Sequence, residues 1–432
     1  MKILIKNTLV PVIQDGKVIV KNSSILINGN KIEKIGNIDE KADEVIEAKN
    51  KLVIPGLINT HSHASMSLFR NYKDDVNLQD WLFNYIFPVE DKLKDGMCYN
   101  LSMLSILEMI KSGITCFADM YFFMEETAKA VTEAGIRANL ARSVSGTNNF
   151  TRESDYMLQE SIKLFKEYNN SADGRIKVSI SPHSIYTCES EYLRECGDIA
   201  RELNADLQVH MCETVSEVEN CKKEHNGMTP FEYCESLDLF NQKGNIIAAH
   251  CVHLDDTDFE IIKNKNINVS HNPTSNLKLA SGIADVPRMM EKGINVTLGT
   301  DGPGSNNKLD ILSEMRLATL IHKGNKLNPE LISAEDTFRM ATINGAKALG
   351  ENNLGEIKEG NIADLVLINI DKPNYYPLQN ERLISALSYS ANSADVEDVI
   401  INGRVIMKNR EVSTVDEEKL KFEVGRVAKC LI

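Results

Sequence analysis

The chain has 432 residues, of which 42% are hydrophobic and 25% charged, and its formal net charge is -14. This length suits one large domain with a smaller one, and the composition is that of a soluble globular protein. The acidic excess argues against nucleic acid or an anionic membrane surface as the partner, because both attract basic patches, and a small-molecule substrate becomes the default expectation.

The N-terminus and the cysteines both predict a cytoplasmic protein. The first residues, Met1 to Asn7, hold too short an apolar run for a signal peptide, and no later run approaches the length of a membrane span. The nine cysteines are an odd number without CxxC spacing. This pattern favours reduced thiols over a disulfide framework or a cysteine zinc site.

The two ends of the chain predict short strands joined by tight turns. At the N-terminal end, strands are expected over residues 3–12, 18–20 and 24–27, with turns at Asp15-Gly16 and Asn28-Gly29. After a helical region at 310–349, strands return at 362–368 and at 399–407, the last interrupted by Asn402-Gly403. We expect both ends to join in a small β-sandwich domain made of residues 1–52 and 356–432, which flanks a larger domain at 53–355.

Between these ends, short apolar strands alternate with helical patterns. Helices are expected where apolar residues recur every three or four positions, as they do over 97–111 and 155–168. After the apolar run that begins at Leu52, seven further strands are expected, at residues 114–119, 137–142, 176–181, 206–210, 245–250, 267–271 and 294–300. Eight alternating β/α units are the number that closes a TIM barrel. The fold class expected is therefore α/β, a distorted (β/α)8 barrel with its chemistry at the carboxyl ends of the strands.

The apolar run from Leu52 stops at two histidines separated by one residue. On an extended backbone, His61 and His63 project from the same face and can bind one ion. His210 ends the fifth expected strand, and Asp301 follows the eighth. Because the strand ends of a barrel converge on one rim, His61, His63, His210 and Asp301 can surround one metal ion.

A single histidine near an apolar run is more often a hydrogen-bonded core residue than a ligand. The coincidence is more informative, since six of the nine histidines lie at or just after expected strand ends: His61, His63, His183, His210, His250 and His271. The other three, His225, His253 and His322, are expected to be structural.

Several motifs, in the right order along the chain, resemble the amidohydrolase superfamily. They are the stretches Gly56 to His63, His210 to Glu213, Ala249 to His253, Ser270 to Pro273 and Gly299 to Gly302. Within this superfamily the chain is similar to the S-adenosylhomocysteine and methylthioadenosine deaminases, on the stretches His63 to Ser67, Asp80 to Leu82, Pro88 to Glu90 and Pro182 to Thr187. The resemblance covers residues 1 to about 410. It implies a metal-dependent hydrolase that deaminates adenosine, 5'-deoxyadenosine, 5'-methylthioadenosine or S-adenosylhomocysteine to the corresponding inosine.

Hydrolytic deamination of an adenine ring requires an activated water, a proton for a ring nitrogen and a proton for the departing ammonia. Glu213, three residues after His210, is our candidate for moving the water proton to N1 of the purine, in preference to a solvated loop glutamate. By resemblance, His250 orients the hydroxide without binding the metal. Asp301 resembles the carboxylate that both contacts the metal and accepts the last hydroxide proton, and a nearby cation keeps such a carboxylate ionised.

The resemblance also implies substrate-binding residues. Glu90 resembles the glutamate that binds the ribose hydroxyls, and His183 the histidine that contacts the same nucleoside. Arg142 resembles the first of two arginines near the 5' substituent, and Arg152, slightly off the family spacing, is the candidate for the second. Ser305 is expected near the purine edge.

One divalent ion per subunit is expected. A bridging carboxylated lysine would need a lysine at the end of the fourth strand, and Lys177 lies at its start. Zinc is the leading candidate, with iron or manganese open, because imidazoles and a carboxylate suit all three. The protein is expected to be a homo-oligomer, a dimer or a tetramer.

Two other functions stay open. The first is another enzyme with the same metal rim, either a deaminase of free bases such as guanine or cytosine or a triazine hydrolase. The second is a metal-free barrel that serves as an assembly or regulatory scaffold.

Overall fold

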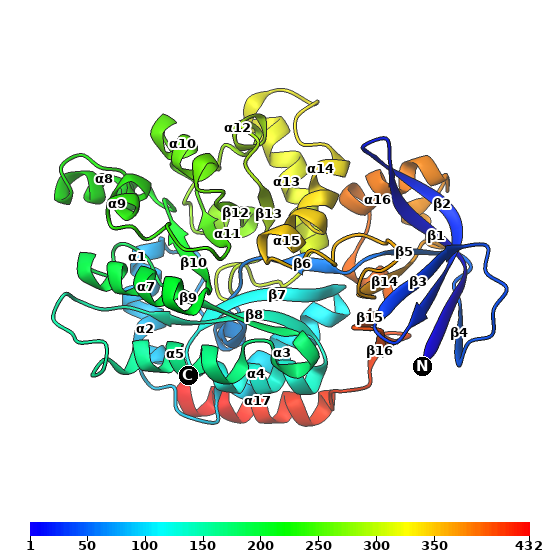
Figure 1. The fold of residues 1–432 in the computed structure, drawn as a ribbon, viewed down its shortest axis with the longest axis horizontal. Helices are drawn as coiled ribbons and strands as arrows, with labels where there is room; N and C mark the ends of the chain where they lie inside the picture. The colour runs from blue at the N-terminus through cyan, green and yellow to red at the C-terminus, as the bar shows by residue number, and fades with distance from the viewer.

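The computed structural model describes residues 1–432 and contains two sheets, which lie side by side along the long axis of the molecule, the smaller one at its right-hand end (Figure 1). The larger unit is an eight-stranded sheet surrounded by helices, and the smaller is a nine-stranded sheet built from both chain ends. None of the helices has the length and apolar character that a membrane crossing requires.

The eight-stranded sheet is a parallel barrel whose strands neighbour one another in chain order. Its strands are β6 (Leu57–Asn59), β7 (Ile114–Tyr121), β8 (Arg137–Val144), β9 (Ile176–Pro182), β10 (Asp206–Met211), β11 (Ile246–His250), β12 (Asn268–His271) and β13 (Val296–Leu298). The backbone N–H of Thr60 donates to the carbonyl of Leu298 at 3.0 Å, which links the ends of the first and last strands. The expected (β/α)8 barrel is confirmed.

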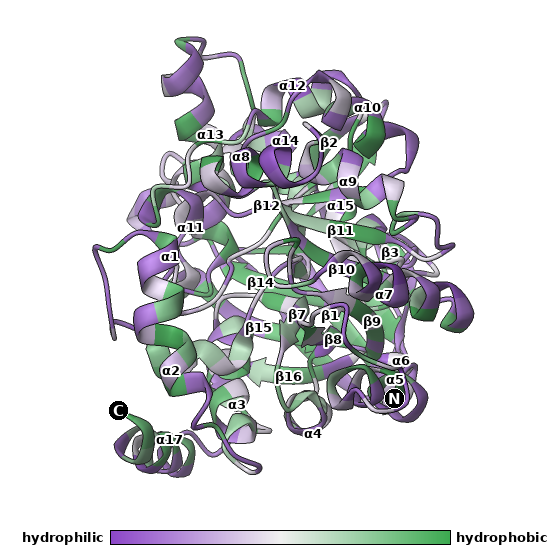
Figure 2. Ribbon diagram, turned by 90° about the vertical axis from the view of Figure 1, so that its left-hand side faces the viewer, coloured by the Kyte–Doolittle hydropathy of each residue, from purple (hydrophilic) through white to green (hydrophobic).

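Helices cover the outside of the barrel. They include α3 (Cys98–Lys111), α4 (Met124–Ala134), α5 (Tyr156–Tyr168), α7 (Ser190–Leu203), α8 (Val215–Glu224), α9 (Pro230–Ser236), α10 (Asp256–Asn264), α11 (Pro273–Lys278), α12 (Val286–Glu291), α13 (Ile311–Lys326), α14 (Ala334–Met340) and α15 (Ile343–Ala348). In Figure 2 the barrel strands, such as β9 and β11, are largely hydrophobic, and the helices around them, such as α7, carry many hydrophilic residues. Burial of this apolar surface is the main force that holds the barrel and helices together.

A run of short helical turns connects β6 to α3. It comprises η1 (Ala64–Phe69), α1 (Leu78–Asp80), the π-helical turn η2 (Trp81–Ile86) and α2 (Phe87–Glu90). Asn77 caps α1, because its side-chain oxygen accepts the N–H of Asp80 at 3.0 Å. The turns pack across the carboxyl ends of the barrel strands, where their residues line a cavity.

The smaller sheet is assembled from β1 (Lys2–Gln14), β2 (Lys17–Asn28), β3 (Lys31–Gly36), β4 (Glu44–Glu47), β5 (Lys51–Pro55), β14 (Leu365–Asn369), β15 (Val396–Ile401), β16 (Arg404–Lys408) and β17 (Glu411–Val412). The tight turns expected at Asp15-Gly16 and Asn402-Gly403 are confirmed. Their φ angles are 50° and 77° in the first turn and 51° and 71° in the second, which is the pattern of a two-residue hairpin turn.

The expected small β unit made of both chain ends is confirmed, and the structure adds three details to it. Its strands are hydrogen-bonded into one sheet, which has its own core of 14 buried residues. The strand β5 belongs to this sheet, so the change to the barrel falls at Gly56 and not after residue 52. The last helix, α17 (Glu417–Leu431), packs against α3 of the barrel (Figure 1), where Lys111 pairs with Glu417. A β-carbon at Gly56 would overlap the Thr115 side chain, which explains why the crossing occurs at a glycine.

Candidate active site

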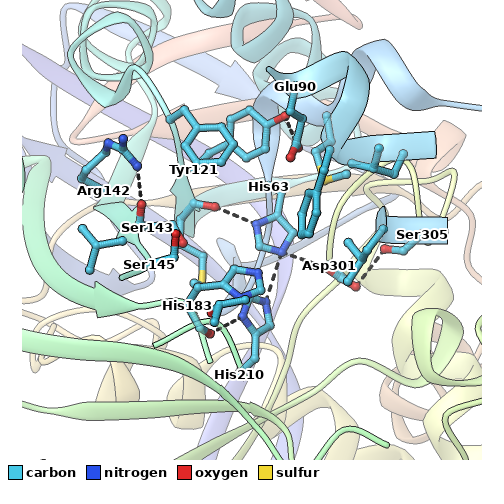
Figure 3. Close-up of a pocket in the computed structure, with 18 of the residues that line it drawn as sticks. His63, Glu90, Tyr121, Arg142, Ser143, Ser145, His183, His210, Asp301 and Ser305 are labelled. Carbon is cyan, nitrogen blue, oxygen red and sulfur yellow. Dashed lines mark hydrogen bonds and ion pairs between the residues drawn. The ribbon is translucent and has the colours of Figure 1, made fainter. Parts of the chain in front are cut away.

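Four side chains from three strand ends meet at the carboxyl rim of the barrel. His61 and His63 follow β6, His210 lies in β10, and Asp301 follows β13. The Oδ1 atom of Asp301 lies 3.1 Å from Nε2 of His63 and 3.4 Å from Nε2 of His61. The Nε2 atoms of His63 and His210 are 3.3 Å apart (Figure 3). The structure thus brings together the four residues expected to hold a metal.

The chemistry of this donor set fits a cation. The Nδ1–H of His63 donates to the carbonyl of Met120 at 2.7 Å, and the Nδ1–H of His210 donates to the carbonyl of His183 at 2.8 Å. Because each Nδ1–H is engaged with a carbonyl, both Nε2 atoms face the site, where a neutral ring offers its lone pair to a cation. The Nε2 atom of His61 is buried without a hydrogen-bond partner. A shared metal ion would satisfy all three nitrogens.

The electrostatics of the site also call for a positive charge. Burial raises the pKa of Asp301, but the neighbouring imidazoles of His61 and His63 outweigh it and hold that pKa well below its usual range. Burial likewise lowers the pKa of His63, yet its hydrogen bond to Asp301 raises it to about 9. A divalent ion held by these side chains would supply the positive charge that the Asp301 carboxylate attracts.

The second oxygen of Asp301 is held by two serines. Its Oδ2 accepts hydrogen bonds from the hydroxyls of Ser275 at 2.6 Å and Ser305 at 2.8 Å. The backbone of Asp301 is left-handed, with φ 61°, which is rare for a residue other than glycine. The strained backbone and the two serines leave Oδ1 directed at the histidines.

Glu213 and His250 lie next to the four donors. The Oε2 atom of Glu213 is 3.8 Å from Nε2 of His250, and its Oε1 accepts a hydrogen bond from Ser281 at 3.1 Å. The Nδ1–H of His250 donates to the Oδ1 atom of Asn276 at 2.8 Å, so its Nε2 faces the site as an acceptor. Burial raises the pKa of Glu213, which brings a carboxylic acid closer to the neutral range where it can both take and give a proton.

A cavity of about 580 Å³ opens from the four donors. One wall is apolar and comes largely from the short helical turns after β6: Met66, Leu78, Trp81, Leu82, Ile86, Phe87 and Leu93. Except for His61 and Arg152, all of the expected site residues line it: His63, Glu90, Arg142, His183, His210, Glu213, His250, Asp301 and Ser305. Such a volume with a few convergent polar groups is typical of a small-molecule site.

Glu90 lies on the wall above His63 (Figure 3). The Tyr121 hydroxyl donates to its Oε1 at 2.5 Å, and burial raises its pKa to about 7. Its other oxygen makes no hydrogen bond within the protein and remains available to a ligand. His183 presents its ring beside His210, with ring centroids 4.7 Å apart, and burial lowers its pKa to about 3. Both are therefore polar groups that line the cavity beside its apolar wall.

The two arginines expected near the 5' substituent occupy different environments. Arg142 lines the far part of the cavity, where its Nε donates to Glu160 of α5 at 2.7 Å. Arg152 does not line the cavity, and this corrects the expectation. Its guanidinium is held on the outside by Glu195 and Glu202, with Nη1 2.6 Å from the carboxylate of Glu202. These two glutamates are seven residues apart on α7, so they share a helix face and together attract the cation.

Several residues of the site escaped sequence reasoning. The expected residues are contacted by Tyr121, Ser275, Asn276 and Ser281. Single serines and asparagines carry no distinctive signal in a sequence. Tyr121 does have a recognisable position, since it ends β7 at the carboxyl rim of the barrel. His271 shows the converse: it ends β12, yet its Nε2 lies 3.2 Å from Nε2 of His322 on α13, away from the cavity. Successive residues on a strand face opposite sides, so a strand end alone does not place a side chain in the site.

Comparison with known proteins supports the same conclusion. The amidohydrolase family model matches residues 52–406. A 5-methylthioadenosine/S-adenosylhomocysteine deaminase from Thermoanaerobacter pseudethanolicus is 47% identical over 100% of both chains, and a 5'-deoxyadenosine deaminase from Methanocaldococcus jannaschii is 48% identical over 97% of both. The crystal structure of an adenosine deaminase from Xanthomonas campestris with bound zinc superposes with a TM-score of 0.92 at 27% identity, over 99% of this chain and 98% of that one. The chain therefore belongs to the amidohydrolase family.

Proposed function

We propose that the protein is a metal-dependent deaminase of adenosine or of 5'-modified adenosines such as 5'-deoxyadenosine, 5'-methylthioadenosine and S-adenosylhomocysteine. The observation that carries this proposal is one cavity with the metal donors, Glu213 and His250 at one end and the free oxygen of Glu90 farther along its wall. We further propose one zinc ion per subunit, held by His61, His63, His210 and Asp301. A symmetric homo-oligomer in the cytoplasm is the state that we expect for such an enzyme.

In this proposal three residues act on the attacking water, and two of them, Glu213 and Asp301, move its protons. A divalent ion lowers the pKa of a bound water to about 7 and so provides a nucleophile at neutral pH. Glu213 takes one proton from the attacking water and delivers it to N1, while the water oxygen bonds to C6 of the purine. His250 orients the attacking oxygen through its Nε2. Asp301 takes the second proton and passes it to the amino group, the C6–N bond breaks, and ammonia and the inosine product result.

The rest of the cavity suits the nucleoside. The apolar wall beside the donors can cover the purine, and the volume of about 580 Å³ leaves room for a ribose and a 5' substituent. The free carboxylate oxygen of Glu90 can accept the ribose hydroxyls, and His183 can contact the same nucleoside. These two contacts distinguish a nucleoside from a free base, because a free base has no ribose to bind them.

The proposal is tested by measuring ammonia release by the zinc-loaded protein. The substrates are adenosine, 5'-deoxyadenosine, methylthioadenosine, S-adenosylhomocysteine and the free bases adenine, guanine and cytosine. We expect kcat/KM for the best nucleoside to exceed that for any free base by about 100-fold or more, since unpaired polar groups in a site strongly disfavour an incomplete substrate. Absence of ammonia release from every adenine nucleoside would refute the proposal.

Replacing Glu90 by alanine should weaken nucleoside binding selectively. The variant loses the acceptor for the ribose hydroxyls, so we expect KM for adenosine nucleosides to rise by about 10- to 100-fold, the usual range for a lost charged hydrogen bond. The pH dependence should change as well. Burial raises the pKa of Glu90 to about 7, and the ionised form is the better acceptor, so wild-type KM should fall as the pH rises through about 7. Steady-state kinetics from pH 5.5 to 8.5 measure both effects, and a KM unchanged in Glu90→Ala would contradict the assignment.

Glu160 should influence which 5' substituent is preferred. It neutralises Arg142 in the far part of the cavity, so an anionic tail must compete with Glu160 for the guanidinium. The Glu160 side chain is 47% exposed, so the pair is weak and the effect of removing it should be modest. We expect Glu160→Gln to leave Arg142 free for an anionic tail and to raise kcat/KM for S-adenosylhomocysteine relative to methylthioadenosine by about fivefold. Glu167→Gln on the exposed part of the same helix is the matched control. A ratio that falls would show instead that Glu160 binds the ammonium group of the tail.

A further inference from the structure

Glu217 is a buried carboxylate next to the active site that the proposed chemistry does not use. It lies in the first turn of α8 and is 5% exposed. It does not line the cavity, and no lysine, arginine or histidine forms an ion pair with it. Burying a carboxylate without a cation is costly unless hydrogen bonds compensate. Its hydrogen bonds therefore indicate why the chain keeps it there.

Both oxygens of Glu217 accept hydrogen bonds from the backbone that carries Glu213. Its Oε1 accepts the N–H of Cys212 at 2.9 Å, and its Oε2 accepts the N–H of Glu213 at 2.8 Å. Cys212 has a left-handed backbone with φ 52°, which turns the two successive N–H groups toward one acceptor. Such a pair of N–H groups forms a small anion-binding concavity, and here the side chain of Glu217 fills it.

The same turn is tied on its other side to the strand end that carries His250. The carbonyl of Cys212 accepts the backbone N–H groups of Val252 and His253, both at 3.0 Å. On the helix side, the N–H of Glu217 donates to the hydroxyl of Thr214 at 3.2 Å, which anchors the start of α8. A continuous set of hydrogen bonds thus runs from α8 through the turn of Glu213 to the loop that follows His250.

We propose that Glu217 is a positioning residue, which holds the Glu213 carboxylate in its working place and affects catalysis only through Glu213. The inference rests on the proposed function, in which Glu213 transfers the protons. If the two N–H groups lost their common acceptor, the left-handed turn at Cys212 would relax and displace the Glu213 side chain. A shift of about 1 Å in a reacting group can cost about 100-fold in rate.

The first test is Glu217→Gln in the zinc-loaded protein. Glutamine keeps the shape but offers one acceptor and turns an NH2 group toward the second backbone N–H. We expect kcat for adenosine deamination to fall by about 10- to 100-fold, with KM and the zinc content unchanged. The matched control is Asp258→Asn on α10. Asp258 is another fully buried carboxyl, which accepts hydrogen bonds from Thr229 and the Asp255 N–H away from the cavity. We expect this control to lose stability and keep its kcat.

A double-mutant cycle then tests whether the effect passes through Glu213. In a Glu213→Gln background, the additional Glu217→Gln change should alter the residual rate by less than about twofold, because coupled residues show non-additive effects. Equal losses in both backgrounds, or an unchanged kcat in the single variant, would overturn the inference. If Glu217→Gln does not fold, Glu217→Asp, which is one methylene too short to reach both N–H groups, replaces it in both arms. An inactive wild type would instead refute the proposed function.

Discussion

Replacing His210 by alanine should remove both the metal and the activity. His210 supplies an inward-facing Nε2 that lies 3.3 Å from Nε2 of His63. Without it the site keeps two imidazoles and a carboxylate. The metal is proposed to shift the pKa of a water from about 15.7 to about 7, so we expect its loss to reduce kcat/KM by four orders of magnitude or more. Elemental analysis of the purified variant, together with ammonia release, measures both effects.

The control for His210→Ala is His225→Ala. His225 stacks on Tyr233 with ring centroids 3.7 Å apart and does not line the cavity. This variant should bind the metal and retain its activity. Treating the wild type with a chelator should reproduce the inactive state, and adding zinc back should restore it. A His210→Ala protein that still held one metal ion per chain and released ammonia at the wild-type rate would disprove the assigned donor set.

Replacing Glu213 by glutamine should abolish most of the rate and spare substrate binding. Glutamine has nearly the same shape and can still accept the hydroxyl of Ser281, but it cannot take up and release a proton. General acid–base groups contribute about 100- to 10000-fold, so we expect kcat to fall by about 1000-fold, or about 4 kcal/mol in barrier height. KM and the metal content should remain within a few-fold of the wild-type values. Steady-state kinetics and metal analysis on the same preparation measure these quantities.

An exposed glutamate provides the control for Glu213→Gln. Glu219 lies on the solvent side of α8, six residues away, and its replacement by glutamine should leave kcat unchanged. A loss of less than tenfold in Glu213→Gln would show that another group moves the proton to N1. His250 would then be the first candidate, since its Nε2 is the nearest basic nitrogen, 3.8 Å from the Glu213 carboxylate.

The barrel could be predicted because its signal is local. Each strand is a short apolar run, and parallel strands with helices between them have one common way to close. The candidate metal donors followed from the same pattern, since residues at the ends of different strands meet at one rim. The sequence also indicated the tight turns at Asp15-Gly16 and Asn402-Gly403, because a two-residue hairpin turn requires left-handed backbone and Asp, Asn and Gly tolerate it.

The places where prediction failed depend on contacts between distant segments. Arg152 had the right residue type in about the right position, but two glutamates on α7 hold it outside the cavity. The strand β5 reads as a continuation of the first barrel strand, and only its pairing with β1 and β14 assigns it to the small sheet. Helix α17 follows the small sheet in the chain yet packs on α3.

The order of apolar runs and polar strand ends was enough to predict the barrel and to propose His61, His63, His210 and Asp301 as metal donors, with Glu213 as a candidate proton carrier. The barrel depends on local hydrophobic periodicity and the donor set on residue types that have few uses in combination, whereas the role of His250 came from the family resemblance. The orientation of these groups becomes visible only in the folded chain: Asn276 sets the direction of His250, Ser275 and Ser305 hold Asp301, and Glu217 holds the turn of Glu213. Orientation depends on hydrogen bonds between segments far apart in the chain, and common residues such as serine and asparagine form them without leaving a recognisable pattern.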